Sequence, residues 1–429
     1  MRAISSGPMA CATFPGALRT GWICAAILIA GSFAYPAFVH GQAYDLLLKG
    51  GHVVDPRNGI DAPMDVAIRA GEIARVARDL PPSEAETVVD ITGYYVTPGL
   101  IDIHTHVFVG NRPRAFADGF SSVSPDDFSF RSGVTTVVDA GTSGWRNFPV
   151  FKEQVIDQSD TRVLAFLNIV GQGMWDDAHN HDLSDMDATK TSSVMKAYPE
   201  IIVGTKVGHF QGEDWDPFDR ALDAAAAAGS PLLLECHLPE LALEKLLERM
   251  RPGDIFTHAF GDVNDRASVL DEEGRVRDYV LEARDKGVLF DVGHGGGSFH
   301  FSLAMPAMEQ GLTPNTFGTD LHRGSMNDGM KDMLNIMSKY LNMGMGLEEV
   351  VERATWGAAK AIRREDLGHL SEGAVGDVAV LDVEKGAFGF IDAGGYKMSG
   401  DKKLEAELTI RGGRIVWDLN GLSAPEWNE

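Results

Sequence analysis

Short apolar segments of strand length alternate with longer helical segments through the central part of the chain. We predict strands at residues 99–106, 135–139, 162–170, 202–207, 232–237, 254–259, 288–293 and 316–321. Before the fifth of these, the alanine-rich run 217–228 favours a helix that ends at Gly229 and Pro231. Apolar strands separated by helices are typical of a parallel sheet covered on both faces.

This repeated pattern predicts an α/β protein with a TIM-like (β/α)8 barrel over residues 98–370. The alternative is an open, doubly wound sheet, which commonly carries a Gly-x-Gly-x-x-Gly turn after an early strand. No such turn follows an early strand here, and the glycine cluster at residues 293–298 comes after the seventh predicted strand. The pattern therefore favours the barrel.

Both flanks of the barrel region contain short strands that alternate in polarity and are separated by glycine turns. Residues 44–49, 65–69 and 88–91 precede the barrel, and residues 377–382 and 407–416 follow it. We predict that residues 44–97 and 371–429 join in one small β-sandwich domain, built from both ends of the chain.

Residues 1–43 differ in composition from the rest of the chain. Arg2 and Arg19 are the only charges before His40, residues 21–30 are apolar, and small residues lead to Ala43. This order is typical of a signal peptide. A membrane anchor is the alternative, although the apolar run is short for a bilayer span. We expect an exported protein, periplasmic or secreted, that has no membrane attachment once the signal is removed.

Charge and cysteine content narrow the partners. The 429 residues are 44% hydrophobic and 23% charged, as in ordinary globular proteins, and the formal net charge is −24. This charge argues against nucleic acid and anionic membrane surfaces as partners. Cys236 is the only cysteine beyond the predicted leader, so we expect no intramolecular disulfide. A small-molecule substrate is expected, and a monomer and a homo-oligomer are both compatible with the sequence.

Side chains that bind metals recur at the ends of the predicted strands. Side chains two residues apart in a strand share a face, so the His-x-His pair that closes the first strand offers two imidazoles together. In a barrel, the carboxyl ends of all strands meet at one mouth. Singly, each such residue has a structural alternative, but together they predict a metal site. The candidate ligands are His104, His106, Lys206, His237, His258 and Asp320.

Three segments give the chain a resemblance to the amidohydrolase superfamily of metal-dependent hydrolases. Residues 97–106, Thr-Pro-Gly-Leu-Ile-Asp-Ile-His-Thr-His, match its first-strand motif, residues 353–362 resemble its last barrel helix, and residues 368–380 resemble the return into the sandwich. The resemblance implies two divalent metal ions, usually zinc, although manganese and cobalt suit similar shells. It also implies that a carboxylated lysine bridges the two ions. By position, His104, His106 and Asp320 would hold one ion, His237 and His258 the other, and Lys206 would bridge them.

This resemblance also implies a reaction. Water between the two ions would lose a proton, and Asp320 would pass that proton to the leaving group. The chain is most similar to the amidohydrolase/deacetylase family metallohydrolases, which cleave amide or ester bonds of small acyl substrates. Those relatives usually carry an arginine where this chain has Gly208.

Two other functions stay open. A cyclic-amide hydrolase of the dihydroorotase or hydantoinase kind would use the same scaffold, although dihydroorotases typically carry an arginine where this chain has Phe108. The other hypothesis is a scaffold protein without catalytic activity, and the complete set of predicted metal ligands argues against it. The glycine-rich loop 293–298 is a candidate substrate-binding element, since backbone N–H groups can approach a ligand there. We expect His294 and Gly296 to contact the substrate.

Overall fold

The computed structural model describes residues 42–109, 121–175, 177–235, 242–262 and 267–427. The predicted signal peptide lies outside the described residues except for its last two positions. His237 and Cys236 also lie outside them.

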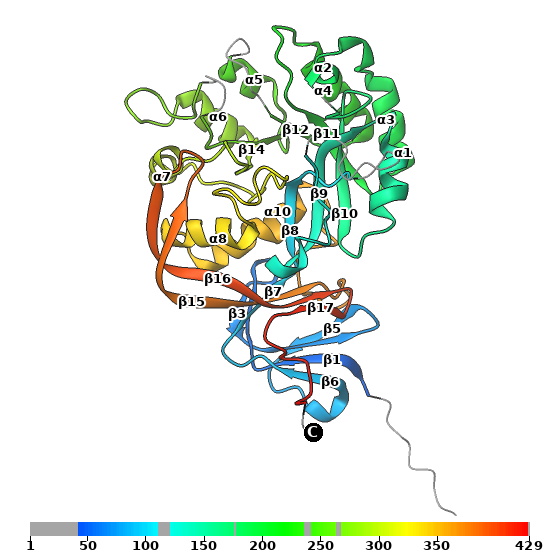
Figure 1. The fold of residues 1–429 in the computed structure, drawn as a ribbon, viewed down its shortest axis with the longest axis vertical. Helices are drawn as coiled ribbons and strands as arrows, with labels where there is room; N and C mark the ends of the chain where they lie inside the picture. Colours follow the sequence, from blue (N-terminus) through cyan, green and yellow to red (C-terminus); the bar gives the residue numbers. More distant parts are fainter. Residues whose placement is uncertain (1–41, 110–120, 176, 236–241, 263–266, 428–429) are drawn as a thin grey trace, which may run out of the picture. The chain divides into compact units, whose positions relative to one another are not determined.

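Parallel strands that follow the chain order form the central sheet. Seven strands lie in the order β14-β13-β12-β11-β10-β9-β8, and each neighbouring pair is parallel (Figure 1). Every residue of β9 is buried, as expected for a strand covered on both faces. The strands are β8 (Leu100–Thr105), β9 (Val134–Gly144), β10 (Arg162–Asn168), β11 (Ile202–Val207), β12 (Leu232–Leu234), β13 (Ile255–Phe256) and β14 (Leu289–Phe290).

The two edges of this sheet are connected through residues 316–321, where we predicted the eighth strand. Thr316 forms a parallel bridge with Asp291 beyond β14, and Leu321 forms one with Thr105 of β8. These are isolated bridges and not a continuous ladder. Asp320 has a φ of 52°, which an extended strand does not accommodate. The sheet is therefore curled, and the segment between its edges brings Asp320 next to β8.

Helices follow the parallel strands along the chain. The predicted helix at 217–228 is observed as α4, and Gly229 ends it in the left-handed conformation with a φ of 69°. The segment that resembles a last barrel helix is divided between α9 and α10 at Thr355. The helices are α1 (Phe148–Phe151), α2 (Asp177–Asn180), α3 (Ala188–Ala197), α4 (Asp216–Ala228), α5 (Leu243–Arg249), α6 (Asp278–Lys286), α7 (Phe301–Glu309), α8 (Met333–Asn342), α9 (Leu347–Ala354) and α10 (Trp356–Ala361).

Strands from the two flanks form two further sheets. One has the order β5-β4-β1-β6 and the other β17-β16-β15-β7-β2-β3, so strands from both chain ends share the second sheet. A buried apolar cluster joins residues of both sheets, including Leu48, Val66, Val96, Val380 and Ile410. The strands are β1 (Tyr44–Lys49), β2 (His52–Asp55), β3 (Ile60–Pro63), β4 (Asp65–Arg69), β5 (Glu72–Ala77), β6 (Ala85–Asp90), β7 (Tyr95–Pro98), β15 (Val378–Ile391), β16 (Lys397–Arg411) and β17 (Arg414–Asp418).

The β15–β16 hairpin extends beyond this sheet to helix α8 (Figure 1). Leu404 of β16 donates its N–H to the Ser338 hydroxyl of α8 over 2.9 Å. Phe390 and Leu404 are buried in the cluster that also contains the barrel strands. The outer half of the hairpin therefore packs on the α/β region, although the prediction assigned residues 371–429 to the sandwich. The separate sandwich domain stays a prediction.

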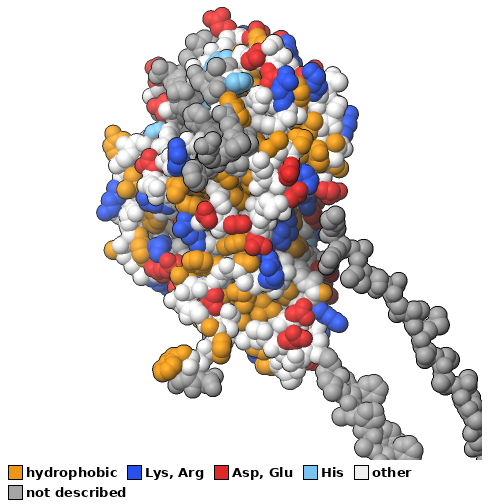
Figure 2. Space-filling view, turned by 45° about the vertical axis from the view of Figure 1, so that its right-hand side comes forward, with side chains coloured by type: hydrophobic (Ala, Val, Ile, Leu, Met, Phe, Trp, Pro, Cys, Tyr) orange, Lys and Arg blue, Asp and Glu red, His pale blue; other side chains and the backbone are white. Residues whose placement is uncertain are grey.

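Acidic and basic side chains are mixed over the face of the molecule in Figure 2. Within the described ranges, no helix is both long enough and apolar enough to cross a membrane.

Replacing Gly229 should test whether its left-handed conformation stabilises the end of α4. A Cβ at Gly229 meets no atom within 4 Å, so the cost of Gly229→Ala is conformational. We expect Gly229→Ala to lower the free energy of unfolding by about 1 kcal/mol. The cost of Gly229→Asn should be smaller, because asparagine tolerates this conformation better. Urea unfolding of the three proteins measures both values, and equal costs for both variants would contradict the explanation.

Candidate metal centre

A first cluster consists of two histidines at the end of β8 and an aspartate in the segment 316–321. Nε2 of His106 lies 3.2 Å from Oδ1 of Asp320, and Nε2 of His104 lies 3.6 Å from the same oxygen. The ligand atoms of all three lie within 4.8 Å of one another. Both imidazoles are buried, whereas the Asp320 side chain keeps 13% exposure. Asp320 is therefore the member of this cluster that reaches toward solvent.

Outer hydrogen bonds determine which nitrogen of His104 faces the cluster. The Thr257 hydroxyl donates to Oδ2 of Asp291 over 2.7 Å, so its oxygen accepts from Nδ1–H of His104 over 2.9 Å. Nε2 of His104 then carries a lone pair. It is buried and has no hydrogen-bond partner among the described residues. A buried lone pair directed toward a carboxylate suits a metal ligand better than a packed core.

His106 also has an outer partner. Its Nδ1 lies 2.8 Å from the hydroxyl of Thr142, whose N–H donates to the Asp139 carboxylate over 2.8 Å. The Nε2 of His106 faces Asp320 at 3.2 Å. Histidines that donate from one nitrogen to an outer partner while the other faces inward are typical of metal sites.

Asp102 connects β8 to the segment that carries Asp320. Its carboxylate accepts from the hydroxyl of Thr319 over 2.5 Å and from the N–H of Thr319 over 3.0 Å. Burial raises the pKa of Asp102 to about 7, against the effect of these bonds. The bonds hold Thr319, and hence the neighbouring Asp320, against the end of β8.

The charge states of the first cluster fit a divalent cation. Burial lowers the pKa of His104 to about 4, so this imidazole is neutral near pH 7 and free to act as a ligand. Burial opposes ionisation of Asp320, but its hydrogen bond to His106 and the charges of the surrounding histidines lower its pKa well below the usual range. A neutral imidazole and an ionised carboxylate are both ligands that divalent transition metals accept.

Lys206 lies at the end of β11, fully buried, and its partner is a residue that the sequence analysis missed. Nζ of Lys206 forms an ion pair with Oε2 of Glu235 at 2.7 Å. His258 and His209 approach the other carboxylate oxygen, at 3.2 Å and 3.0 Å. Glu235 is the first residue after β12. Its signal in the sequence was strand alternation, since residues 235 and 237 of an extended run share a face.

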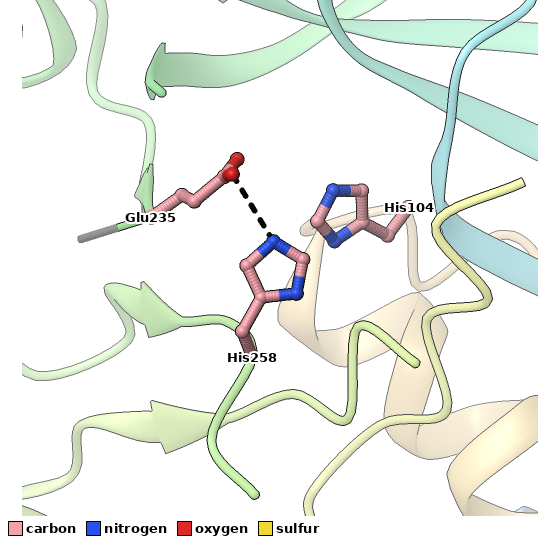
Figure 3. A group of neighbouring side chains, drawn as sticks. All are labelled: His104, Glu235 and His258. Atoms are coloured by element: carbon pink, nitrogen blue, oxygen red, sulfur yellow. Dashed lines mark ion pairs between the residues drawn. The ribbon is translucent and has the colours of Figure 1, made fainter. Parts of the chain in front are cut away.

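The structure thus describes a second cluster beside the first. His104, Glu235 and His258 have ligand atoms within 4.8 Å of one another (Figure 3). Of the six predicted ligands, five are described, and they are His104, His106, Lys206, His258 and Asp320. All five contribute to these two clusters or to the Glu235 ion pair. The sixth, His237, lies outside the described residues.

Three of the eight non-glycine residues with a positive φ in the described part of the chain lie at this site. His209, His258 and Asp320 all have a positive φ, of 55°, 59° and 52°. Non-glycine residues adopt this conformation at a cost, and such residues gather at functional sites. The turn also explains why β13 is shorter than predicted, because His258 leaves the extended conformation two residues after Phe256.

The glycine-rich loop approaches the site through its backbone. Gly295 has a φ of 52°, and a Cβ there would overlap the Asp320 carboxylate, so a glycine is required. His294 is fully buried, however, and both ring nitrogens are engaged. Its Nδ1 lies 2.9 Å from the carbonyl of Gly295, and its Nε2 lies 2.6 Å from Nζ of Lys339. The substrate contacts predicted for His294 and Gly296 stay predictions.

A curled parallel sheet with imidazoles and carboxylates near its strand ends defines the class as an α/β protein with a candidate metal centre. The profile of the Amidohydrolase family matches residues 303–416. A deacetylase from Brucella anthropi is 30% identical over 367 residues, 83% of this chain and 88% of its own length. A deacetylase from Agrobacterium fabrum is 31% identical over 353 residues, 81% and 84% of the two chains.

Solved structures give the same result. The crystal structure of an adenine deaminase has a TM-score of 0.79 and 28% identity over 87% of this chain and 100% of its own. The crystal structure of a dihydroorotase has a TM-score of 0.76 and 28% identity over 87% and 99%. The chain belongs to the amidohydrolase family, and the predicted resemblance and hydrolase function are confirmed.

Lys339 provides a pH test of its own burial beside His294. Burial lowers the pKa of Lys339 from 10.5 to about 7, with Asp392, Lys331 and Asp332 facing it. The unfolded chain keeps this proton up to about pH 10.5, so it binds more protons than the folded protein between pH 7 and 10.5. The free energy of unfolding therefore rises with pH in this window.

We expect the difference in unfolding free energy, wild type minus Lys339→Met, to grow by about 1 to 3 kcal/mol between pH 7 and about 9.5. Urea unfolding at several pH values measures it. Lys196 is an exposed lysine, so Lys196→Met is the matched control and should show no such trend. Parallel pH profiles of wild type and Lys339→Met would contradict the assignment.

Proposed function

We propose that this protein is a metal-dependent hydrolase that cleaves an amide or ester bond of a small acyl substrate. The observation that carries the proposal is the inward lone pair of His104 beside the Asp320 carboxylate, with a second carboxylate and imidazole next to it. The similarity to deacetylases over more than four-fifths of the chain supports this substrate class.

The chain's own residues account for proton transfer and positioning. When bound, divalent ions polarise the substrate carbonyl and lower the pKa of water. The Asp320 carboxylate, which is ionised and partly exposed, accepts the proton of the attacking water and donates it to the departing nitrogen or oxygen. His106 orients Asp320, and Asp102 holds the Asp320 segment through Thr319.

Several finer features belong to this proposal. We infer two divalent ions, with zinc as the expected metal, and a carboxylated Lys206. Its full burial at the end of β11, next to the imidazoles and 2.7 Å from Glu235, supports a role in the site. We also infer an exported protein whose leader is residues 1–43 and a β-sandwich made of both chain ends, which the shared sheet and its apolar cluster support.

A cyclic-amide hydrolase is the second candidate function, because a dihydroorotase structure is similar over nearly its whole length. Phe108 disfavours it. This side chain is fully buried in the apolar core, so the position offers no cation for the carboxylate of dihydroorotate.

Substrate assays after metal reconstitution test the proposed function. We expect hydrolysis of N-acetyl amino acids to exceed that of dihydroorotate and of hydantoins by at least about tenfold. Removal of metal with a chelator should abolish the activity, and added zinc, manganese or cobalt should restore it, because the metal would polarise the substrate carbonyl. Activity that survives complete metal removal would rule out this mechanism, and a preference for hydantoins would favour the second candidate.

Lys206→Ala tests the carboxylated lysine. We expect kcat/KM to fall by about 100-fold or more, since losses of even outer ligand partners reach that size. Millimolar acetate or propionate should partly restore it by supplying a carboxylate in the space of the side chain. Lys196→Ala, at an exposed lysine, is the control. Full activity and metal content in Lys206→Ala without added acid would contradict the assignment.

A further inference from the structure

Glu235 occupies a ligand position at the end of a central strand. Its N–H donates to the carbonyl of Val207 over 3.0 Å, so the backbone is still held in the sheet next to β11. The side chain is only 2% exposed and points toward the same space as His104 and His258 (Figure 3). A carboxylate buried this deeply needs cationic partners or a metal.

The contact between Glu235 and His258 calls for a cation. Nδ1 of His258 lies 2.6 Å from the carbonyl of Gly293, which only accepts, so Nδ1 carries the hydrogen. In the neutral ring, Nε2 then holds a lone pair, and this atom faces Oε1 of Glu235 at 3.2 Å. Two acceptors in direct contact repel each other unless a proton or a metal ion lies between them.

His104 adds an independent observation. Its buried Nε2 has no hydrogen-bond partner among the described residues, and it lies within 4.8 Å of the ligand atoms of Glu235 and His258. Three ligand atoms thus surround one space, and outer hydrogen bonds fix an inward lone pair on two of them, those of His104 and His258. A single proton between Glu235 and His258 would leave the His104 nitrogen unsatisfied.

Room for Glu235 beside Lys206 depends on Gly208. A Cβ at position 208 would lie 2.9 Å from Cε of Lys206 and 3.1 Å from Oε2 of Glu235. Both distances are tighter than ordinary van der Waals contact. Gly208, where this chain departs from the deacetylase pattern, therefore lies next to the Glu235 carboxylate. Because glycine has no side chain, it leaves room for the ion pair between Glu235 and Lys206.

We propose that Glu235 is a metal ligand of this site and holds the second divalent ion together with His258, in the place for which the sequence predicted His237. The inference rests on the proposed function. A carboxylate oxygen is an accepted zinc ligand, and Oε1 of Glu235 is the oxygen that faces His258. His209 approaches the same oxygen at 3.0 Å.

Metal content of purified variants tests this ligand. Wild type reconstituted with zinc and passed through a desalting column should retain about two equivalents by mass spectrometry of the metal. Glu235→Gln should retain about one, because an amide is a poor zinc ligand, whereas Glu235→His should retain about two. Glu407→Gln is the matched control, a buried glutamate in β16 that bonds Asn420, and should retain about two.

Cobalt spectra keep the test decisive if Glu235→Gln folds poorly. In the cobalt-substituted protein, Glu235→His should shift the visible absorption bands, because an imidazole replaces a carboxylate in the shell. Unchanged bands, or two retained ions in folded Glu235→Gln, would show that Glu235 is only a counter-ion of Lys206 and not a metal ligand. Loss of an ion in His237→Asn but not in Glu235→Gln would show that the ligand is His237, as the sequence predicted. No metal in wild type would instead defeat the proposed function itself.

Discussion

The site depends on one constraint, which is the fixed orientation of its buried imidazoles. Thr257, Thr142 and the carbonyl of Gly293 each engage an Nδ1 atom, of His104, His106 and His258 respectively. With the outer nitrogen bonded, each Nε2 atom faces the Asp320 or Glu235 carboxylate. For His104 and His258, this arrangement places acceptor beside acceptor, which is unfavourable in a dry interior unless a cation is present. A divalent ion bound at this centre would relieve the repulsion.

Holding these groups in place costs backbone strain and space. His258 adopts a left-handed conformation just after β13, and Asp320 adopts one within residues 316–321. Gly295 is needed because any Cβ there would overlap Asp320. Residues 316–321 consequently contribute bridges to both sheet edges instead of a full ladder. The surrounding hydrogen bonds, above all those from Thr319 to Asp102, over-determine this strained geometry and keep it from relaxing.

The loop after β14 is supported from outside the parallel sheet. The ring of His294 stacks on the ring of Phe299, and its Nε2 contacts Nζ of Lys339 in α8. The β15–β16 hairpin packs on α8 in turn. The C-terminal hairpin therefore reinforces the helix that holds the glycine-rich loop next to Asp320. This continuity explains why a segment that the sequence assigns to a separate domain contributes apolar residues to the core of the α/β region.

Periodicity and residue type were enough to predict the parallel α/β sheet, the helix that ends at Gly229 and the positions of His104, His106, Lys206 and His258 at or just after strands. These features are local, since an apolar run and its flanking residues define them. Glu235 and the enclosure of His294 depended on tertiary structure. His294 meets Lys339 across 45 residues, and Glu235 meets Lys206 and His258 only because three neighbouring strands are in register. Strand alternation in the sequence gives the face of residue 235, but only the register between strands and the packing of distant segments decided that Glu235 meets Lys206 and His258.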